Sequence, residues 1–304
     1  MILGGSAFLK LLRVMTILIL ILAAFIWYTF PPAERRLDRL TTSDIACGGI
    51  ENPCMVGTRT YNLLVPKGEG PFPAVVFFHG SFGSGAKIIR SPVIAEPLLR
   101  NGYALIAPSA LDITYAGNRP SSGWIWEGQR GDRDDHRFVQ DVVNDATSRF
   151  LIDGENLIVG GSSNGATFVW YLACAGVDSR LQHFAPVGGA LVRDRPLSCA
   201  TVQPDFAMLH THGRNDTVVP VDGTQPTVTW HGWLGPEESL LMLTETANCA
   251  ELEDHTPDQG VRSRRWYDCQ SGAEFRLDIT DNGHEIPSAW AETVMTWHNR
   301  TRSD

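Results

Sequence analysis

The sequence predicts an α/β fold in which a doubly wound, mostly parallel sheet carries helices on both faces. Short apolar runs alternate along the chain with stretches of helical periodicity, which is the order expected of parallel strands joined by crossover helices. The run at residues 73–78 is apolar throughout, as in a strand buried on both faces. Right-handed crossovers would then cover both faces of the sheet with helices.

The expected elements follow one another from residue 61 to residue 298. An edge strand at residues 61–66 precedes the buried strand at 73–78. Further strands are predicted at residues 104–107, 157–159, 183–187, 206–210, 264–269 and 274–279. Helices are predicted at residues 93–100, 134–150, 166–172, 237–249 and 288–298. Residues 111–133 form one long irregular segment, the kind that serves as a lid or a binding loop.

Composition is that of an ordinary globular protein. The chain has 304 residues, of which 43% are hydrophobic and 19% charged, and this length fits one large domain behind an N-terminal segment. The formal net charge of -9 argues against a nucleic-acid partner, which would require a basic face.

The N-terminus resembles an export segment. Residues 14–30 carry no charge, follow Lys10 and Arg13, and end at two prolines. Two interpretations stay open, an uncleaved signal-anchor and a cleaved signal peptide. Residues 1–30 are therefore assigned to this segment, residues 31–46 to a polar stalk or linker, and residues 47–304 to the catalytic domain. The protein is expected outside the cytoplasm, periplasmic or secreted, and attached to the membrane if residues 14–30 are retained.

Six cysteines follow this segment. An even, dispersed set behind an export signal indicates disulfides formed in an oxidising compartment, although sequence alone does not establish the pairing. Chain order suggests three local pairs, Cys47–Cys54, Cys174–Cys199 and Cys249–Cys269. No C-x-x-C motif is present, which disfavours a zinc ribbon or a redox site, and no metal is expected.

The motif at residues 161–165, Gly-Ser-Ser-Asn-Gly, is the most informative feature. It reads G-x-S-x-G between an apolar run and a helix-compatible stretch, the setting of a nucleophile elbow. In such a turn the glycines avoid steric clashes and the central residue, Ser163, projects its hydroxyl; Ser162 is not the nucleophile. An ordinary glycine-rich turn between strand and helix is the alternative.

A serine nucleophile needs a base and an acid, and both are found downstream in the required order. Asp216 follows the predicted strand at 206–210, and His284 follows the strand at 274–279, so each lies at the carboxyl end of a strand. Asp222 and His255 are weaker candidates, because Asp222 is farther from its strand and His255 lies in a polar, exposed stretch.

Upstream, the strand at 73–78 runs into His79-Gly80-Ser81-Phe82, where this arrangement places an oxyanion hole. The expected backbone donors are Asn164 and either Ser81 or Phe82, and His79 is expected to hold the turn rather than to act as a base. Trp124 and Trp126, on the long irregular segment, are candidates for an aromatic substrate-binding wall; core packing explains them equally well.

Together these motifs resemble the polyhydroxybutyrate depolymerase and feruloyl esterase (LpqC-like) group of α/β-hydrolases. The matching segments are residues 79–80, 124–126, 141–143, 161–165, 212–220 and 283–287, within a region of about residues 56–298. The group commonly pairs cysteines at the positions of Cys249 and Cys269. Two positions depart from its pattern, Ala166 after the elbow and Ile286 after the histidine.

The resemblance implies an α/β-hydrolase fold and a serine carboxylic ester hydrolase that works through an acyl-enzyme without metal or cofactor. The implied substrates are small-molecule or oligomeric esters, either short-chain, hydroxyalkanoate, or aryl- or sugar-linked. A peptidase or thioesterase on the same fold is the main alternative. An inactive, anchored hydrolase-like binding module is another.

Overall fold

The structure is a computed structural model that describes residues 13–20, 33–43, 45–114, 120–195, 204–256 and 260–302. The chain divides into two units, Met1–Arg39 and Leu40–Asp304. Residues 13–20 are helical, and helix α2 (Ala33–Leu40) occupies part of the predicted stalk. No helix among the described residues is long and apolar enough to cross a membrane, and residues 21–30 of the predicted anchor lie outside them.

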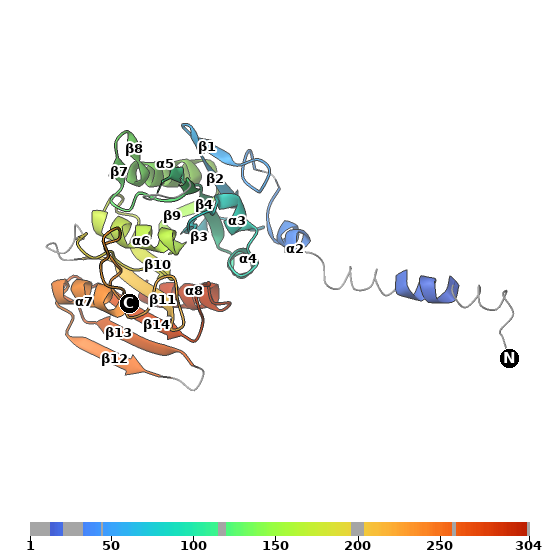
Figure 1. The fold of residues 1–304 in the computed structure, drawn as a ribbon. Helices are drawn as coiled ribbons and strands as arrows, with labels where there is room; N and C mark the ends of the chain where they lie inside the picture. Colours follow the sequence, from blue (N-terminus) through green and yellow to red (C-terminus); the bar gives the residue numbers. More distant parts are fainter. Residues whose placement is uncertain are drawn as a thin grey trace, which may run out of the picture. The chain divides into compact units, whose positions relative to one another are not determined.

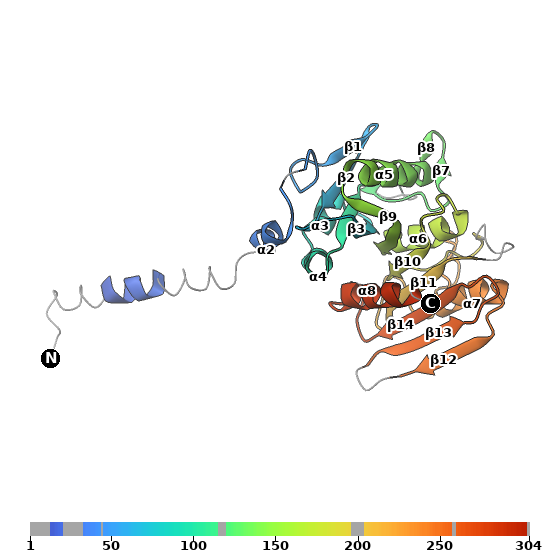
Figure 2. The ribbon, with the colours of Figure 1, turned by 180° about the vertical axis from the view of Figure 1, so that it is seen from behind.

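A ten-stranded sheet organises the second unit (Figures 1 and 2). Its order is β1-β2-β4-β3-β9-β10-β11-β14-β13-β12. The strands from β4 to β14 in this order run parallel, and an antiparallel pair of strands flanks them at each edge. In chain order the strands are β1 (Cys54–Val56), β2 (Arg59–Leu64), β3 (Phe72–Phe78), β4 (Ala104–Pro108), β9 (Ile152–Ser162), β10 (His183–Val187), β11 (Ala207–Gly213), β12 (Glu251–His255), β13 (Arg262–Tyr267) and β14 (Glu274–Thr280). The prediction of a mostly parallel sheet is confirmed.

Helices cover both faces, as predicted. They are α3 (Gly85–Ile89), α4 (Ala95–Arg100), α5 (Asp135–Arg149), α6 (Asn164–Ala175), α7 (Pro236–Thr246) and α8 (Trp290–Thr301). Successive side chains of a strand point to opposite faces, so neighbours on β3 reveal what covers each side. Phe78 packs edge-on against Phe168 of α6, with ring centroids 5.0 Å apart, whereas Phe77 packs against Trp290 of α8 at 5.1 Å.

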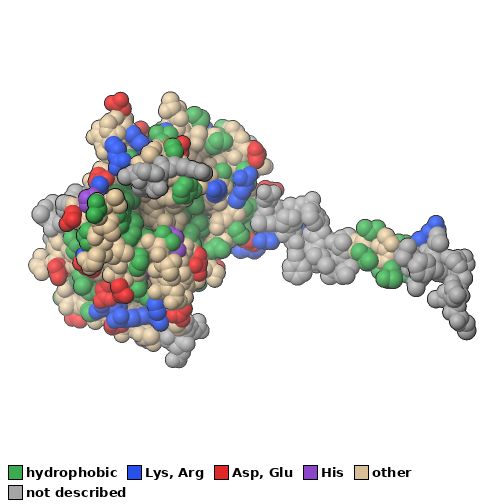
Figure 3. Space-filling view, in the orientation of Figure 1, with side chains coloured by type: hydrophobic (Ala, Val, Ile, Leu, Met, Phe, Trp, Pro, Cys, Tyr) green, Lys and Arg blue, Asp and Glu red, His purple; other side chains and the backbone are tan. Residues whose placement is uncertain are grey.

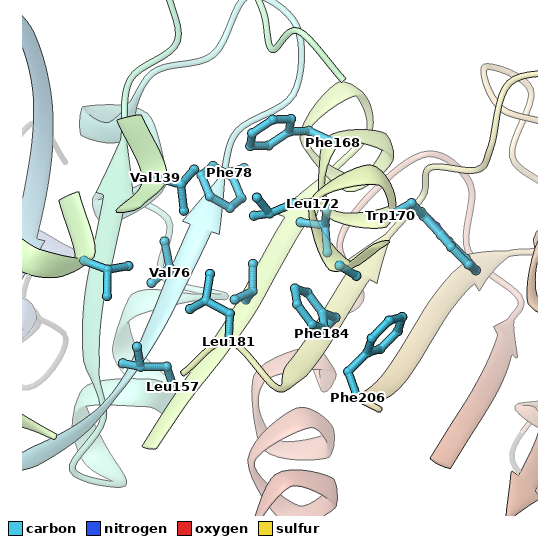
Figure 4. Packing of buried hydrophobic residues seen from close by; sticks show 14 of the residues in the cluster. Val76, Phe78, Val139, Leu157, Phe168, Trp170, Leu172, Leu181, Phe184 and Phe206 are labelled. Carbon is cyan, nitrogen blue, oxygen red and sulfur yellow. The ribbon is translucent and has the colours of Figure 1, made fainter. Parts of the chain in front are cut away.

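The core between the sheet and α6 is dense and apolar (Figure 4). Val76 and Phe78 of β3 lie there with Val139 of α5 and with Phe168 and Leu172 of α6, all buried. A side chain of this size contributes roughly 1.5–3 kcal/mol when it is fully removed from water. This packing provides a rigid support for the loops at the carboxyl ends of the parallel strands.

The sheet edge at β12 differs from the prediction. Every residue of β12 is exposed, and its charged side chains pair with neighbours on β13, as Asp254 does with Arg262 at 2.7 Å. Without a buried face the strand has no hydrophobic alternation, so the sequence pattern did not reveal it. Figure 3 shows basic and acidic side chains intermixed on the face in view.

Two of the three predicted disulfides lie within the described residues. Cys47 is bonded to Cys54, and Cys249 is bonded to Cys269. The third predicted pair includes Cys199, which lies outside the described residues. Disulfides of this kind are typical of proteins that mature in an oxidising compartment.

Candidate active site

The turn between β9 and α6 has the strained geometry of a nucleophile elbow. Ser163 adopts φ 54° and ψ -120°, a conformation that non-glycine residues rarely take. A Cβ at Gly161 would lie 2.6 Å from the carbonyl oxygen of Gly165, and a Cβ at Gly165 would clash with the carbonyl oxygen of Phe78. The expectation that this turn needs both glycines is confirmed.

Three predicted residues meet at the carboxyl ends of their strands in one hydrogen-bonded chain. Ser163 Oγ lies 2.9 Å from His284 Nε2, and His284 Nδ1 lies 2.7 Å from Asp216 Oδ2. Because a carboxylate only accepts, Nδ1–H donates to Asp216, and in neutral imidazole Nε2 is then free to accept the serine proton. The hydroxyl of Ser163 thus lies within hydrogen-bond distance of an imidazole nitrogen of His284, and Asp216 sets the tautomer of that ring.

The second carboxylate oxygen of Asp216 is also hydrogen-bonded. Asp216 Oδ1 accepts from the backbone N–H groups of Val218 and Val219, both at 2.8 Å, while Oδ2 faces His284. The Asp216 side chain is fully buried and the His284 side chain is 23% exposed. The hydrogen-bonded residues therefore extend from a buried carboxylate, that of Asp216, to a partly exposed imidazole, that of His284.

The loops that carry Asp216 and His284 are joined directly. The N–H of Asn215 donates to the carbonyl of Asn282 at 3.0 Å, and its side-chain amide donates to the carbonyl of Asp281 at 2.7 Å. Gly213 allows this approach, since a Cβ there would clash with the carbonyl oxygen of Gly283. Two segments distant in sequence are thereby fixed in register.

The turn after β3 lies against the elbow, as expected of an oxyanion turn. A Cβ at Gly80 would come within 3.0 Å of Ser163 Cβ. His79 holds this turn: its Nδ1–H donates to the carbonyl of Gly80 at 2.7 Å, and its Nε2 accepts from the N–H of Ala110 at 3.0 Å. Burial lowers the pKa of His79, which favours the neutral ring that both bonds require.

The two predicted donors on this turn differ in one respect. The N–H of Phe82 donates to the carbonyl of Ser122 at 3.1 Å. This contact favours Ser81, immediately after Gly80, and both assignments stay predictions. Asn164, the other predicted donor, directly follows Ser163 as the first residue of α6.

The two tryptophans of the irregular segment have different surroundings. Trp124 is buried, stacks on Phe168 at 5.2 Å, and donates through its indole N–H to the carbonyl of His79 at 2.9 Å. Trp126 lies against Trp230 and Trp233, with ring centroids 6.3 and 5.8 Å away. Trp124 therefore has extensive core contacts, and both tryptophans also line the pocket described next.

A pocket of about 90 Å³ opens beside this segment. Trp126 and Trp230 line it together with Ile113, and Arg195 also lines it, paired with Glu127. Trp124 lines it as well, and the N–H of Trp124 donates to Asn164 Oδ1 at 2.8 Å.

Asp135, the residue that organises the irregular segment, was not predicted from the sequence. Its fully buried carboxylate accepts from Arg59 at 2.6 Å, from Arg133 at 2.7 Å, and from the N–H of Ile125 at 2.8 Å. Burial lowers the pKa of Arg59, against the opposing influence of Asp135. The Arg-Asp-Asp pattern there resembles an exposed acidic helix start, and only the two arginines at hydrogen-bond distance reveal a buried site.

The weaker candidates do not join the site. Asp222 and His255 are exposed, and neither takes part in the hydrogen bonds that join Ser163, His284 and Asp216. No group of three or more His, Cys, Asp or Glu side chains within the described ranges is arranged to hold a metal ion.

Comparisons with solved structures establish the fold. No protein-family model matches the sequence, and no curated protein does. The chain is similar to a carboxylesterase from Bacillus cereus (15% identity, TM-score 0.52, covering 81% of this chain and 95% of that one). It is also similar to an acetyl xylan esterase from Aspergillus awamori (16% identity, TM-score 0.54, covering 80% of this chain and 94% of that one). A third similar structure is an S-formylglutathione hydrolase from Agrobacterium tumefaciens (10% identity, TM-score 0.53, covering 83% of this chain and 99% of that one). The protein has the α/β-hydrolase fold, and identities this low show the fold alone.

Proposed function

We propose that the protein is a serine hydrolase that cleaves carboxylic esters. The observation that carries this proposal is the hydrogen-bonded chain Ser163–His284–Asp216, with distances of 2.9 and 2.7 Å, on a strained elbow. A nucleophile and a base within hydrogen-bond reach, with a third group orienting the base, form the general signature of covalent catalysis. The esterases among the structural neighbours agree with it.

In the proposed reaction the hydroxyl of Ser163 attacks the acyl carbon while His284 accepts its proton. Asp216 holds the imidazole in the required tautomer and stabilises the imidazolium. His284 then protonates the leaving alkoxide, and the acyl-enzyme forms. Water attacks the acyl-enzyme with His284 again acting as base, which releases the acid and restores the serine.

The negative charge that develops on the carbonyl oxygen requires N–H donors placed in advance. Asn164 and Ser81 are the proposed pair, because one follows the nucleophile and the other follows Gly80, which abuts Ser163. Loss of one such donor typically lowers kcat by about 10²–10³.

Substrate selection is assigned to the pocket beside the elbow. Its aromatic wall at Trp126 and its volume of about 90 Å³ favour small acyl groups or single aryl rings over long acyl chains. Short-chain, hydroxyalkanoate and aryl- or sugar-linked esters remain the proposed substrates, in line with the polyhydroxybutyrate depolymerase and feruloyl esterase resemblance. The two disulfides support a site of action outside the cytoplasm.

Labelling and turnover of the full-length protein test this function. A fluorophosphonate is expected to modify Ser163, and p-nitrophenyl acetate and butyrate are expected to be hydrolysed. Ser163→Ala should abolish both, whereas the neighbouring Ser162→Ala serves as the matched control and should retain both. Undiminished turnover in Ser163→Ala would refute the mechanism.

A panel of matched amides and thioesters tests the ester assignment itself. Faster turnover of either class than of the corresponding ester would replace esterase by peptidase or thioesterase. A protein that is neither labelled nor active would support the inactive binding module.

A further inference from the structure

Two histidines outside the proposed triad are buried directly behind its acid. His210 and His212 lie on β11, two residues apart, so both side chains point to the same face of the sheet. Neither side chain is exposed to solvent. Buried histidines need hydrogen-bond partners, and the partners of this pair lead to Asp216.

Their contacts allow a single arrangement of protons. His212 Nε2 lies 2.8 Å from the carbonyl oxygen of Val219, which only accepts, so this nitrogen carries the proton. In neutral His212, Nδ1 is then an acceptor, and it lies 3.0 Å from His210 Nε2, which donates to it. His210 Nδ1 has no hydrogen-bond partner among the described residues.

The surroundings keep both rings neutral. Burial lowers the pKa of His210 well below its ordinary value, and it also lowers the pKa of His212. The titratable groups that act on His212 are His210, Asp216 and His284. On its other side His210 faces the indole of Trp170 on α6, with ring centroids 5.4 Å apart.

The pair braces the loop that carries the acid. Val219, whose carbonyl accepts from His212, donates its own N–H to Asp216 Oδ1. His212 Nε2 itself lies 3.6 Å from Asp216 Oδ2, the oxygen that faces His284. One imidazole therefore fixes the loop that positions Oδ1, and its Nε2–H group lies 3.6 Å from Oδ2.

We propose that His212, held in its Nε2–H tautomer by His210, is a positioning residue that orients Asp216 toward His284. The inference rests on the proposed function, because it assigns a role within the same reaction. In the absence of His212, the carbonyl of Val219 loses its donor and the loop is free to rotate the carboxylate away from His284. Small displacements of such groups lower rates by up to about 10²-fold.

Three substitutions at residue 212 separate positioning from packing. The amide nitrogen of Gln is able to reach the Nε2 position and donate to Val219, whereas that of Asn corresponds to the Nδ1 position, and Leu does neither. His212→Leu and His212→Asn are expected to lower kcat on p-nitrophenyl acetate by about 30-fold with KM changed less than about 2-fold. His212→Gln should recover most of the loss. Equal activity of the Gln and Asn variants, or wild-type kcat in the Leu variant, would overturn the proposal.

His210→Leu provides a second variant in case residue 212 tolerates no change. It removes the donor to His212 Nδ1, so that the Nε2–H tautomer of His212 is no longer fixed. In the other tautomer His212 Nε2 has no proton to donate to Val219, and the loop that holds Asp216 loses this hydrogen bond. The kcat on p-nitrophenyl acetate should therefore fall, by less than in His212→Leu and with KM unchanged, whereas a role in packing alone would lower stability without changing kcat.

A readout that does not use turnover distinguishes failure of this inference from failure of the proposed function. The His284 Nδ1 proton shared with Asp216 is expected as a low-field proton resonance in the wild-type protein. It should weaken or shift in His212→Leu and be retained in His212→Gln. If the wild-type protein is inactive and this pattern still holds, the proposed function fails and the positioning role stands. An unchanged resonance in His212→Leu refutes the positioning role.

Discussion

Polar groups lie at both ends of the parallel strands in this sheet, on loops at one end and against a helix at the other. At the carboxyl ends, Ser163, Asp216 and His284 lie on loops that follow β9, β11 and β14, and their chain ends at a partly exposed imidazole. At the amino ends, His183 begins β10 and Glu274 begins β14, and both contact α8.

The difference lies in what each set of groups is attached to. The carboxyl-end groups are joined to one another through loops and a strained elbow, and such strain is typical of functional sites. The amino-end groups are joined to a helix that also packs on the core through Trp290. The first end should therefore govern activity and the second stability, and the following experiments test this division.

The largest effect is expected from Asp216→Asn at the carboxyl end. An amide in place of the carboxylate permits the wrong tautomer of His284, and the equivalent change in other serine triads lowers kcat by about 10⁴. The melting temperature should change little, because the amide still occupies the same site. Steady-state kinetics and thermal denaturation measure the two quantities. A large loss of stability with preserved turnover would contradict the proposed division.

Loss of the Cys249–Cys269 disulfide, near the amino ends, should do the reverse. The bond spans 20 residues of sequence, and opening a loop of that size costs about 3 kcal/mol of unfolding free energy in the chain-entropy estimate. The double variant Cys249→Ser, Cys269→Ser should unfold at lower urea concentration with unchanged kcat at 25 °C. Wild-type protein without reductant is the control. A fall in kcat at urea concentrations well below the unfolding transition would show that this bond affects activity as well as stability.

The same division explains what was predictable from sequence. The apolar runs of β3, β4, β9, β10 and β11, and the serine, aspartate and histidine at strand ends, follow local patterns that one sequence reveals. Two features follow no such local pattern: the hydrogen bond of the Phe82 N–H and the burial of the Asp135 carboxylate. Each depends on a partner far along the chain, Ser122 for Phe82 and Arg59 for Asp135, and periodicity carries no information about such pairs.

Two short charged segments, β12 and α2, were also not predicted from the sequence. Strand β12 has no buried face and so lacks the alternation by which strands are recognised, and helix α2 spans only eight residues. The contacts of His210 and His212 were not predicted, because the sequence of a strand does not indicate the hydrogen-bond partners of its histidines.

A smaller effect on stability is expected from Glu274→Gln. This carboxylate accepts from Arg265 at 2.6 Å and from Arg300 at 3.0 Å, and its side chain is 11% exposed. Removing the charge takes the anion from Arg300 and leaves Arg265 only its contact with the exposed Glu253, so unfolding free energy should fall by about 2 kcal/mol. Asp254→Asn, in an exposed pair with Arg262, is the matched control and should change little. Comparable losses in both variants would show that burial of Glu274 is unimportant.

The smallest effect concerns pH and the histidine pair at the amino end. The rings of His183 and His298 lie 4.6 Å apart. Burial lowers the pKa of His183 to about 4 and that of His298 to about 3, from an ordinary value of 6.5. Below pH 6.5 the unfolded chain therefore takes up protons that the folded chain does not. The stability that depends on neutral rings is complete above about pH 6.5 and is lost as pH falls toward 3–4.

His298→Gln removes one of these groups and should flatten the pH dependence. Between pH 7 and pH 5.5 the variant should lose about 1 kcal/mol less unfolding free energy than the wild-type protein, because one histidine no longer titrates in the unfolded state alone. Urea denaturation at the two pH values measures this difference, and His255→Gln, at an exposed position, is the control. Since neither residue contacts the triad, the kcat–pH profile should stay unchanged in His298→Gln. A shifted profile would mean that the two ends of the sheet are coupled, whereas equal slopes in all three proteins would show that His298 titrates alike in the folded and unfolded chains.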